Sequence, residues 1–399
     1  MDKVFHIRAY SSLNGTCLDA ELDLPATDYE LLDLMGCLQT KDAGQIDLDI
    51  YPTEEYDYLS NKIQEPGLIQ LNTLARRLAE LDIQGMAAFE GLVCMDLQKG
   101  EKTIPVPLLI DYAYSGDCCH VVEDAVTDAD LGRFLAENDF ISEVDSLSDA
   151  AFELLDFQRI GKEHREAEGG AFTGFGYVER HSELHRVSKT MDFQPRKPPY
   201  TVLLNIARFP NIGGSETSPE PVPIQLPASG EELQNALAKL EKPDWKGVMA
   251  AILDCPIPSM NKRLFLEEGI SQVIEWAEVL RTLEKANNLP KYKALLKAVG
   301  CEEVTEALRL AGSLEEYKFD PTLHTEENVA VAFLTENISE DLLERIRPHL
   351  PLWTLSKLGE GLLEAFNETL TPYGAISRKD GQPFQDMNDQ PGQGGMEMS

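Results

Sequence analysis

The chain has 399 residues, with 69 acidic and 35 basic side chains and a formal net charge of −34. Its hydrophobic fraction of 43% is ordinary for a folded protein, so the charge does not come from an acidic chain without a core. Such a charge excludes attraction to nucleic acid or to anionic membrane surfaces and favours a basic partner. Residues 1–190 hold 37 acids and 15 bases, so the excess is larger in this half.

Cysteine usage and hydropathy predict a cytoplasmic protein. The seven cysteines are odd in number, scattered and without a CxxC pair, which is typical of reduced thiols; they are Cys17, Cys37, Cys94, Cys118, Cys119, Cys255 and Cys301. The opening MDKVFHIRAY lacks the apolar core of a signal peptide, and no run of about 18 apolar residues follows. We therefore expect neither export nor a membrane span.

The first predicted elements are a strand over 4–10, a second extended segment and a capped helix. In Asp19-Ala20-Glu21-Leu22-Asp23-Leu24, alternation would place three carboxylates on one strand face, about 6.6 Å apart. That spacing is comparable to the spacing of phosphates along one DNA strand. Thr27 and Glu30 then form a capping box, in which each side chain bonds the other residue's backbone N–H and fixes the helix start.

An internal repeat of about 200 residues runs through the sequence. Leu24-Pro25-Ala26-Thr27 with Glu30 returns as Leu226-Pro227-Ala228-Ser229 with Glu232. Helically spaced apolar residues Leu68, Leu71, Leu74, Leu78 and Leu81 return as Ile270, Val273, Trp276, Leu280 and Leu283. Phe134–Asn138 returns as Phe333–Asn337, and Gly161, Thr173, Phe175 and Gly176 return as Gly359, Thr371, Tyr373 and Gly374. Four ordered blocks at nearly constant offset indicate a duplication.

The repeat divides each copy into three small subdomains. The predicted boundaries are an N-terminal subdomain 1–60, a helical middle 61–105 and a C-terminal subdomain 106–184, a linker 185–200, the corresponding second-copy subdomains 201–245, 246–300 and 301–376, and a disordered tail 377–399. The predicted fold class is α+β, an elongated chain of small subdomains with antiparallel sheets and a helical middle in each tandem copy.

Carboxylates distributed along the first copy are the dominant chemical feature. The candidate surface comprises Asp19, Glu21, Asp23, Asp28, Asp33, Asp47, Asp49, Glu54, Glu55, Asp57, Glu123, Asp124, Asp128, Asp130, Glu137, Asp139, Glu143, Asp145 and Asp149. Because duplex DNA carries one charge per about 1.7 Å of axis, the chain's net charge at that density would cover on the order of 60 Å. The alternative interpretation of any single run of carboxylates is a solvated face that serves only solubility.

Other patterns give weaker signals, and we predict no catalytic residue, cofactor or metal. Asp47-Leu48-Asp49 lacks the ligand order of a calcium loop. His181 with His185, and Cys118-Cys119-His120, lack the further ligands of a zinc site. Gly169–Gly176 lacks the ending of a phosphate loop and lies among acids, so we expect a hairpin turn there.

The segment from Asp130 to Tyr177 resembles the C-terminal region of ArdA antirestriction proteins. Leu154 to Glu163 (LLDFQRIGKE) matches that family's [YL][IL]D[YF]Qx[YI]G[RK][DE] run, and Gly170-Ala171-Phe172 follows as its Gly-x-Phe strand. Leu68–Asn72 resembles the family's ISxLN-type helix start. The resemblance covers about residues 3–180, and more faintly 200–376 through the repeat.

The resemblance implies a protein of mobile genetic elements whose carboxylates imitate B-form DNA and occupy the DNA groove of type I restriction-modification enzymes. It implies no enzymatic activity and no direct binding of nucleic acid. It also implies that the motif residues Leu154, Leu155, Asp156, Phe157, Gln158 and Gly161 form a subunit or inter-copy contact. The chain would then be a monomer with an internal pseudo-dimer, or a homodimer.

Two departures from the family pattern matter. Family members are usually single-copy chains, whereas this chain has two copies. The second copy reads Thr354-Leu355-Ser356-Lys357-Leu358-Gly359, without the motif's Asp and Gln, and is less acidic. We therefore expect it to act more as a structural partner than as a mimic surface. The alternative function is an acidic adaptor or sequestering protein that binds other basic DNA-binding proteins.

Overall fold

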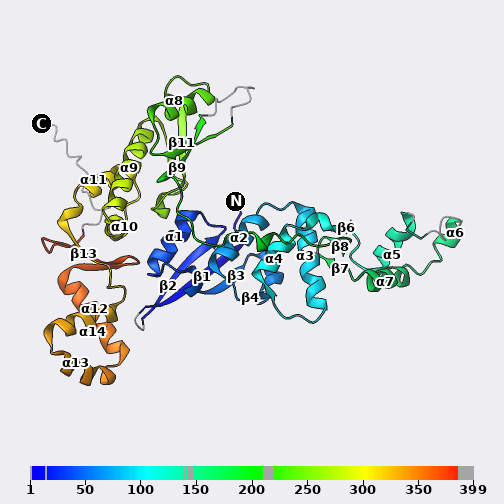
Figure 1. Ribbon diagram of the computed structural model, residues 1–399, viewed down its shortest axis with the longest axis horizontal. Helices are drawn as coiled ribbons and strands as arrows, with labels where there is room; N and C mark the ends of the chain where they lie inside the picture. The colour runs from blue at the N-terminus through cyan, green and yellow to red at the C-terminus, as the bar shows by residue number, and fades with distance from the viewer. Residues whose placement is uncertain (1, 14–15, 139, 142–147, 210–219, 385–399) are drawn as a thin grey trace, which may run out of the picture. The chain divides into compact units, whose positions relative to one another are not determined.

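The computed structural model describes the chain except residues 1, 14–15, 139, 142–147, 210–219 and 385–399 (Figure 1). It is a mixed α+β protein with several small antiparallel sheets, which confirms the predicted class. Its contacts define two compact units: unit 1 comprises residues 1–26 and 40–195, and unit 2 comprises 27–39 and 196–399. In the described part of the chain, no helix is long and apolar enough to cross a membrane.

Unit 1 begins with a three-stranded antiparallel sheet of order β2-β1-β3. Its strands are β1 (Phe5–Leu13), β2 (Thr16–Leu24) and β3 (Asp47–Pro52), followed by the 3-10 segment η2 (Glu54–Leu59); η1 (Ala43–Gln45) precedes β3. Side chains alternate across the sheet, so Phe5, Ile7 and Leu24 are buried on the inner face. The predicted alternation of residues 19–24 is confirmed.

The middle of unit 1 is helical. Its elements are β4 (Ile63–Gln64), α2 (Leu68–Leu78), α3 (Ile83–Gln98), β5 (Ile104–Pro105) and α4 (Val106–Ala113), with β4 and β5 paired in parallel. The predicted apolar stripe of α2 is confirmed, because Leu68, Leu71, Leu74 and Leu78 are buried. Asn72, also buried, holds this helix to the N-terminal sheet region by bonding both backbone groups of Ala26, at 2.7 and 3.1 Å.

The last part of unit 1 joins a small sheet to crossing helices. Its elements are η3 (Gly116–Cys118), β6 (Cys119–Glu123), α5 (Asp128–Glu137), α6 (Asp149–Phe152), α7 (Phe157–Glu168), β7 (Ala171–Thr173) and β8 (Gly176–Arg180). The sheet has order β6-β8-β7. Since β7 and β8 pair directly across Gly174 and Phe175, the hairpin predicted for Gly169–Gly176 is confirmed.

Unit 2 contains α1 (Asp28–Cys37) and the rest of the chain. Its other elements are β9 (Val202–Arg208), β10 (Val222–Leu226), α8 (Gly230–Lys239), β11 (Val248–Asp254), η5 (Pro258–Met260), β12 (Leu264–Phe265), α9 (Glu267–Lys285), α10 (Leu289–Ala298), α11 (Val304–Gly312), η6 (Leu314–Glu316), β13 (Tyr317–Asp320), α12 (Glu326–Asn337), α13 (Glu340–Ile346), η7 (Arg347–His349), α14 (Leu352–Phe366), β14 (Glu368–Thr371) and β15 (Gly374–Arg378). Trp276 and Tyr292 are fully buried in its core, where the indole N–H donates to the Tyr292 hydroxyl at 3.1 Å.

The succession of elements in residues 1–180 returns in residues 202–378. Sheet order β2-β1-β3 corresponds to the first three strands of the four-stranded sheet β10-β9-β11-β12, and β6-β8-β7 corresponds to β13-β15-β14. Both predicted capping boxes are present, at Thr27 with Glu30 and at Ser229 with Glu232. The sequence repeat is therefore matched by a repeat of secondary structure and strand order.

A close helix crossing also occurs twice. A Cβ on Gly161 of α7 would overlap the Asp128 carbonyl oxygen of α5, and a Cβ on Gly359 of α14 would overlap the Glu326 carbonyl oxygen of α12. Only glycine allows these backbones to approach so closely. The repeated Gly161 and Gly359 are thus explained by helix packing.

Three details differ from the predicted boundaries. Helix α1 lies in the predicted first subdomain, yet its contacts group it with unit 2. The start of the predicted linker, residues 185–200, packs on unit 1: η4 (Val187–Lys189) contacts α4, and the Ser188 N–H donates to the buried Asp111 carboxylate at 2.9 Å. The predicted tail begins too early, because Ser377 and Arg378 belong to β15 and the Phe384 ring stacks on Tyr317. Residues 385–399 lie outside the described chain.

Candidate functional site

The outer face of the β2-β1-β3 sheet gathers carboxylates from two strands. We define this acidic sheet face as Asp19, Glu21 and Asp23 on β2, His6, Arg8 and Tyr10 on β1, and Asp47, Asp49 and Tyr51 on β3. The acids are all exposed, since strand alternation turns them away from the core. Five carboxylates thus share one face with a single guanidinium.

Strand register fixes the layout of this face. The cross-strand rows are Asp23–His6–Tyr51, Glu21–Arg8–Asp49 and Asp19–Tyr10–Asp47. Because β1 lies between β2 and β3, the two acidic columns are two strand spacings apart, or about 9.5 Å, with roughly 6.6 Å between acids within a column. The result is two parallel columns of negative charge separated by a central column of donors.

The central donors orient individual acids. Arg8 donates to Asp19 Oδ2 from Nε and Nη2, at 3.1 and 2.9 Å, and the Tyr10 hydroxyl donates to Asp49 Oδ2 at 2.8 Å. The Arg8–Asp19 hydrogen bond raises the pKa of the guanidinium, and the bond to Asp49 raises the pKa of Tyr10. Both donors therefore keep their protons, and their hydrogen bonds hold the two carboxylates in position.

A hydrogen bond also joins His6 Nδ1 to Asp23 Oδ1, at 2.8 Å. All these pairs are exposed, so each contributes little to stability. Their effect is geometric, because they restrict the rotamers of Asp19, Asp23 and Asp49. Glu21 and Asp47, both exposed, complete the two columns.

The equivalent sheet of unit 2 has a different outer face. The outward positions are Pro223 and Gln225 on β10, Leu203, Asn205 and Ala207 on β9, and Met249, Ala251 and Leu253 on β11. None of these side chains is ionisable. The same strand order therefore supports an acidic face in unit 1 and an uncharged face in unit 2.

Most of the other predicted surface acids are exposed. They are Glu54, Glu55, Asp57, Glu123, Asp124, Asp130 and Glu137. Asp130 completes the capping box of α5 with Thr127, and Glu137 forms an ion pair with Arg133 at 3.4 Å. Asp139, Glu143 and Asp145 lie outside the described residues, and Asp149 is placed only as the first residue of α6.

Asp33 was predicted as a surface acid, and this was wrong. Its side chain is 14% exposed, and Oδ1 accepts from Lys293 Nζ at 2.5 Å. The Tyr373 hydroxyl bonds both carboxylate oxygens at 3.1 Å. Asp33 therefore anchors α1 within unit 2, where Tyr29 also donates to the Tyr200 carbonyl at 2.6 Å. Asp28, on the same helix, is half-buried.

Asp128 is a second acid with a structural role, which corrects its place on the predicted surface. Its carboxylate is 13% exposed and accepts two bonds from Arg165, at 2.8 and 3.2 Å. This hydrogen bonding lowers the pKa of Asp128. The pair joins α5 to α7 beside the Gly161 crossing.

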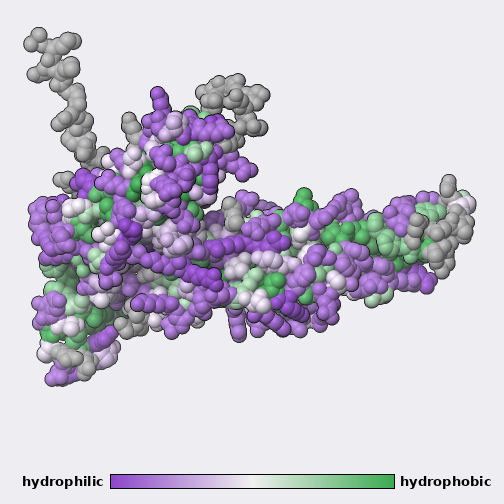
Figure 2. Space-filling view, turned by 45° about the horizontal axis from the view of Figure 1, so that its top comes forward, coloured by the Kyte–Doolittle hydropathy of each residue, from purple (hydrophilic) through white to green (hydrophobic). Residues whose placement is uncertain are grey.

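The motif residues divide between packing and surface. Gly161 is buried at the helix crossing, which excludes it from a surface contact, and Asp156 caps α7 by accepting the Arg159 N–H at 3.1 Å. Phe157 is half-buried beneath the Arg133 guanidinium, 4.5 Å from its ring centre. Leu154 is 85% exposed, and hydrophobic residues show on the surface over α5 and α7 in Figure 2.

Gln158 and Leu155 complete the predicted motif set. Gln158 is exposed and donates to Asp128 Oδ2 at 3.4 Å, while Leu155 is half-buried. At the equivalent place in unit 2, the first two residues of the Gly359 helix, Leu352 and Trp353, are 73% and 65% exposed. Both units therefore present apolar side chains at the start of the glycine-containing helix.

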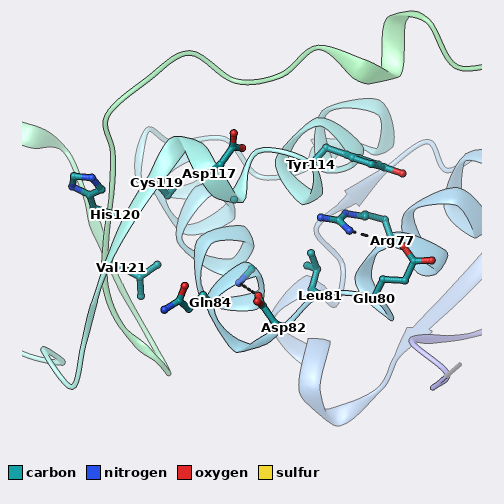
Figure 3. Close-up of a pocket in the computed structure, with 12 residues that line it drawn as sticks. Arg77, Glu80, Leu81, Asp82, Gln84, Tyr114, Asp117, Cys119, His120 and Val121 are labelled. Atoms are coloured by element: carbon teal, nitrogen blue, oxygen red, sulfur yellow. Dashed lines mark hydrogen bonds and ion pairs between the residues drawn. The ribbon is translucent and has the colours of Figure 1, made fainter.

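Unit 1 also contains a polar cavity of about 750 Å³. It is lined by Arg77, Glu80, Leu81, Asp82, Gln84, Gly85, Tyr114, Gly116, Asp117, Cys119, His120 and Val121 (Figure 3). Arg77 forms an ion pair with Glu80 at 3.9 Å and stacks on Tyr114, and Asp82 caps α3. The side chains of Arg77, Glu80, Tyr114 and Asp82 thus form structural contacts within unit 1.

One grouping at the edge of this cavity has no local sequence signal. His185 Nε2 lies 2.9 Å from Asp117 Oδ1, although 68 positions separate the two residues. Neither residue was among the predicted site residues. The pairing depends on how the segment after β8 folds back over η3, which spacing alone does not reveal.

Searches against models of protein families, against curated proteins and against solved structures found no match to this chain.

Proposed function

We propose that the chain is a DNA-mimicking antirestriction protein, built as two tandem ArdA-like copies, that occupies the DNA groove of type I restriction-modification enzymes. The proposal rests on the resemblance of residues 154–163 and 170–172 to that family and on the acidic sheet face of unit 1. The observation that carries it is the pair of carboxylate columns formed by β2 and β3.

The geometry of these columns suits a DNA-binding groove. B-form DNA presents two phosphate backbones bounding grooves that range in width from about 6 Å (minor groove) to about 12 Å (major groove). The columns, about 9.5 Å apart, lie within that range. Arg8 and Tyr10 hold Asp19 and Asp49 in place, so less conformational entropy is lost on binding.

Inhibition by this route requires no bond to be made or broken. Phosphate contacts supply most of the sequence-independent affinity of proteins for DNA, so an array of fixed carboxylates would compete for the same lysines and arginines. The further exposed acids Glu54, Glu55 and Asp57 follow β3 directly and extend the negative surface. Because the charge is distributed, we expect loss of function to be graded across many acids.

Unit 2 is proposed to act as a structural partner. Its equivalent sheet presents no charge on the outer face, so it offers no phosphate-like columns. The exposed motif residue Leu154 is proposed to take part in the subunit contact that the family resemblance implies. Light scattering of the wild type and of a Leu154→Ser variant distinguishes a 44.4 kDa monomer from a dimer.

The test of the proposed function is competition for a purified type I restriction-modification enzyme. Unlabelled full-length protein is titrated against labelled duplex DNA at two salt concentrations. The affinity of the enzyme for the duplex is measured at the same two concentrations. We expect complete displacement, with an apparent affinity that falls steeply as salt rises. Absence of displacement at any concentration contradicts the proposal, and binding to other basic DNA-binding proteins in its place would favour an acidic adaptor.

A further inference from the structure

We propose that Asp117, Cys118 and His185 bind a divalent transition-metal ion, with Zn²⁺ the best match. Their three donor atoms, a carboxylate oxygen, a thiol sulfur and an imidazole nitrogen, all lie within 4.8 Å of one another. His185 Nε2 is 2.9 and 3.1 Å from the two Asp117 oxygens, and Cys118 Sγ is 3.9 Å from Asp117 Oδ1. This inference does not depend on the proposed function.

The backbone around the three residues is already fixed. The buried Ser115 hydroxyl donates to the Asp111 carbonyl at 2.7 Å and accepts the His185 N–H at 2.9 Å. On the other side, the His181 N–H donates to the Cys118 carbonyl at 3.0 Å. The segment that carries His185 is thus tied down both before and after the cluster, so little ordering is left for a metal to impose.

The distances are close to those of a tetrahedral site. With Zn–S near 2.3 Å and Zn–N and Zn–O near 2.0 to 2.2 Å, tetrahedral ligand atoms lie roughly 3.2 to 3.8 Å apart. Small side-chain rotations at Asp117 and His185 would bring the donor atoms to these separations, and both side chains have room to rotate because they are 73% and 48% exposed. In Figure 3 the Asp117 side chain, at the edge of the polar cavity, points away from Asp82 and Gln84.

The donor set selects the class of metal. Calcium and magnesium prefer oxygen ligands, whereas a thiolate with an imidazole and a carboxylate suits zinc and its neighbours. Binding would replace the thiol proton of Cys118, which is now donated to the Glu183 carbonyl at 3.1 Å, and release that proton to solvent. Three protein ligands leave the fourth position for water, and the ion would link η3 to the segment after β8.

Cobalt titration of the full-length, reduced chain tests the site, because Co²⁺ replaces Zn²⁺ and absorbs light. We expect one Co²⁺ per chain, a thiolate-to-cobalt charge-transfer band, and displacement of Co²⁺ by Zn²⁺. The band should disappear in Cys118→Ala, and His185→Gln should weaken Co²⁺ binding at least tenfold. The matched controls Cys119→Ser and His181→Gln change a neighbouring thiol and a neighbouring imidazole, and should bind as the wild type does.

Since Cys118 is buried, folding of Cys118→Ala is checked by circular dichroism. If that variant does not fold, Co²⁺ binding by His185→Gln tests the proposed site. We also expect Zn²⁺ to raise the unfolding temperature of the wild type but not that of His185→Gln. The proposal is overturned if the wild type shows no charge-transfer band, if His185→Gln binds Co²⁺ unchanged, or if the controls lose the band as well.

Discussion

The N-terminal sheets of the two units share a strand order and differ in what they present to solvent. In β2-β1-β3, two columns of acids flank Arg8 and Tyr10, whereas in β10-β9-β11 the corresponding positions are uncharged. The inner faces of both sheets are mainly apolar, and their residues are buried or half-buried. Packing requirements therefore fix only alternate residues of a strand, so the other residues are free to acquire or lose a binding surface.

The largest expected effect concerns a contact found only in unit 2. Lys293→Met leaves the Asp33 carboxylate buried without its ion pair, because both side chains are less than 15% exposed. Removing one partner of a buried pair costs about 3 to 5 kcal/mol, measured here by urea unfolding. Lys297→Met changes an exposed lysine one turn later on α10 and should have almost no effect. Equal stability of the two variants would show that α1 is not anchored by this pair.

The close helix crossing that occurs once in each unit predicts a similar loss of stability when its glycine is replaced. Gly161→Ala and Gly359→Ala each force a methyl group against a helix carbonyl, and we expect each to destabilise its unit by about 1 to 3 kcal/mol. Gly361→Ala is the matched control on α14, since open space surrounds that position and alanine favours a helix. If Gly359→Ala behaved as Gly361→Ala does, the two helix crossings would not be equivalent.

The Asp128–Arg165 pair occurs only in unit 1 and predicts a pH effect. Arg165 lowers the pKa of Asp128 in the folded state below its unfolded value near 3.9. The stability that this pair contributes is therefore complete above about pH 4 and is lost as the pH falls through the lowered pKa. In unfolding curves measured at a series of pH values, the free energy of unfolding of the wild type should exceed that of Asp128→Asn at neutral pH. The two values should converge below pH 4. A constant difference across this range would contradict the assignment.

The smallest expected effect is a gain in affinity from a substitution in the acidic sheet face. Arg8→Gln removes the one guanidinium between the carboxylate columns, so affinity for a basic groove should rise about two- to fivefold. Stability should change by less than about 1 kcal/mol, because the Arg8–Asp19 pair is exposed. Arg281→Gln, which breaks an exposed pair on α9, makes the same change in net charge and should leave affinity unchanged. A loss of affinity in Arg8→Gln would mean that fixing the Asp19 side chain matters more for binding than removing the positive charge.

Local sequence signals predicted local structure well. Alternation placed Asp19, Glu21 and Asp23 on one strand face, and the Thr27 and Ser229 capping boxes marked two helix starts. Each of these signals lies within a few residues and follows from strand or helix geometry.

Contacts between distant residues left no such signal. The registry that brings Asp49 beside Tyr10, the burial of Asp33 against Lys293 and the pairing of Asp117 with His185 all depend on tertiary packing. An acid that pairs in the core looks the same in the sequence as one that faces solvent. Asp33 and Asp128 were therefore misplaced, although the acidic strand over residues 19–24 was predicted correctly.

We propose that the protein imitates DNA through the arrangement of charge on the acidic sheet face and not through its net charge alone. The most direct test of this proposal compares two full-length variants, each with five carboxylates converted to amides. The first changes Asp19, Glu21, Asp23, Asp47 and Asp49; the second changes the exposed unit 2 residues Glu231, Glu275, Glu303, Glu315 and Glu336.

The measurement is displacement of labelled duplex from a type I restriction-modification enzyme at fixed salt. At about 0.5 kcal/mol per exposed charge contact, the sheet variant should lose on the order of 50-fold in affinity, while the matched variant should stay within about threefold of the wild type. Equal losses in the two variants would contradict the account, because net charge alone would then explain the binding.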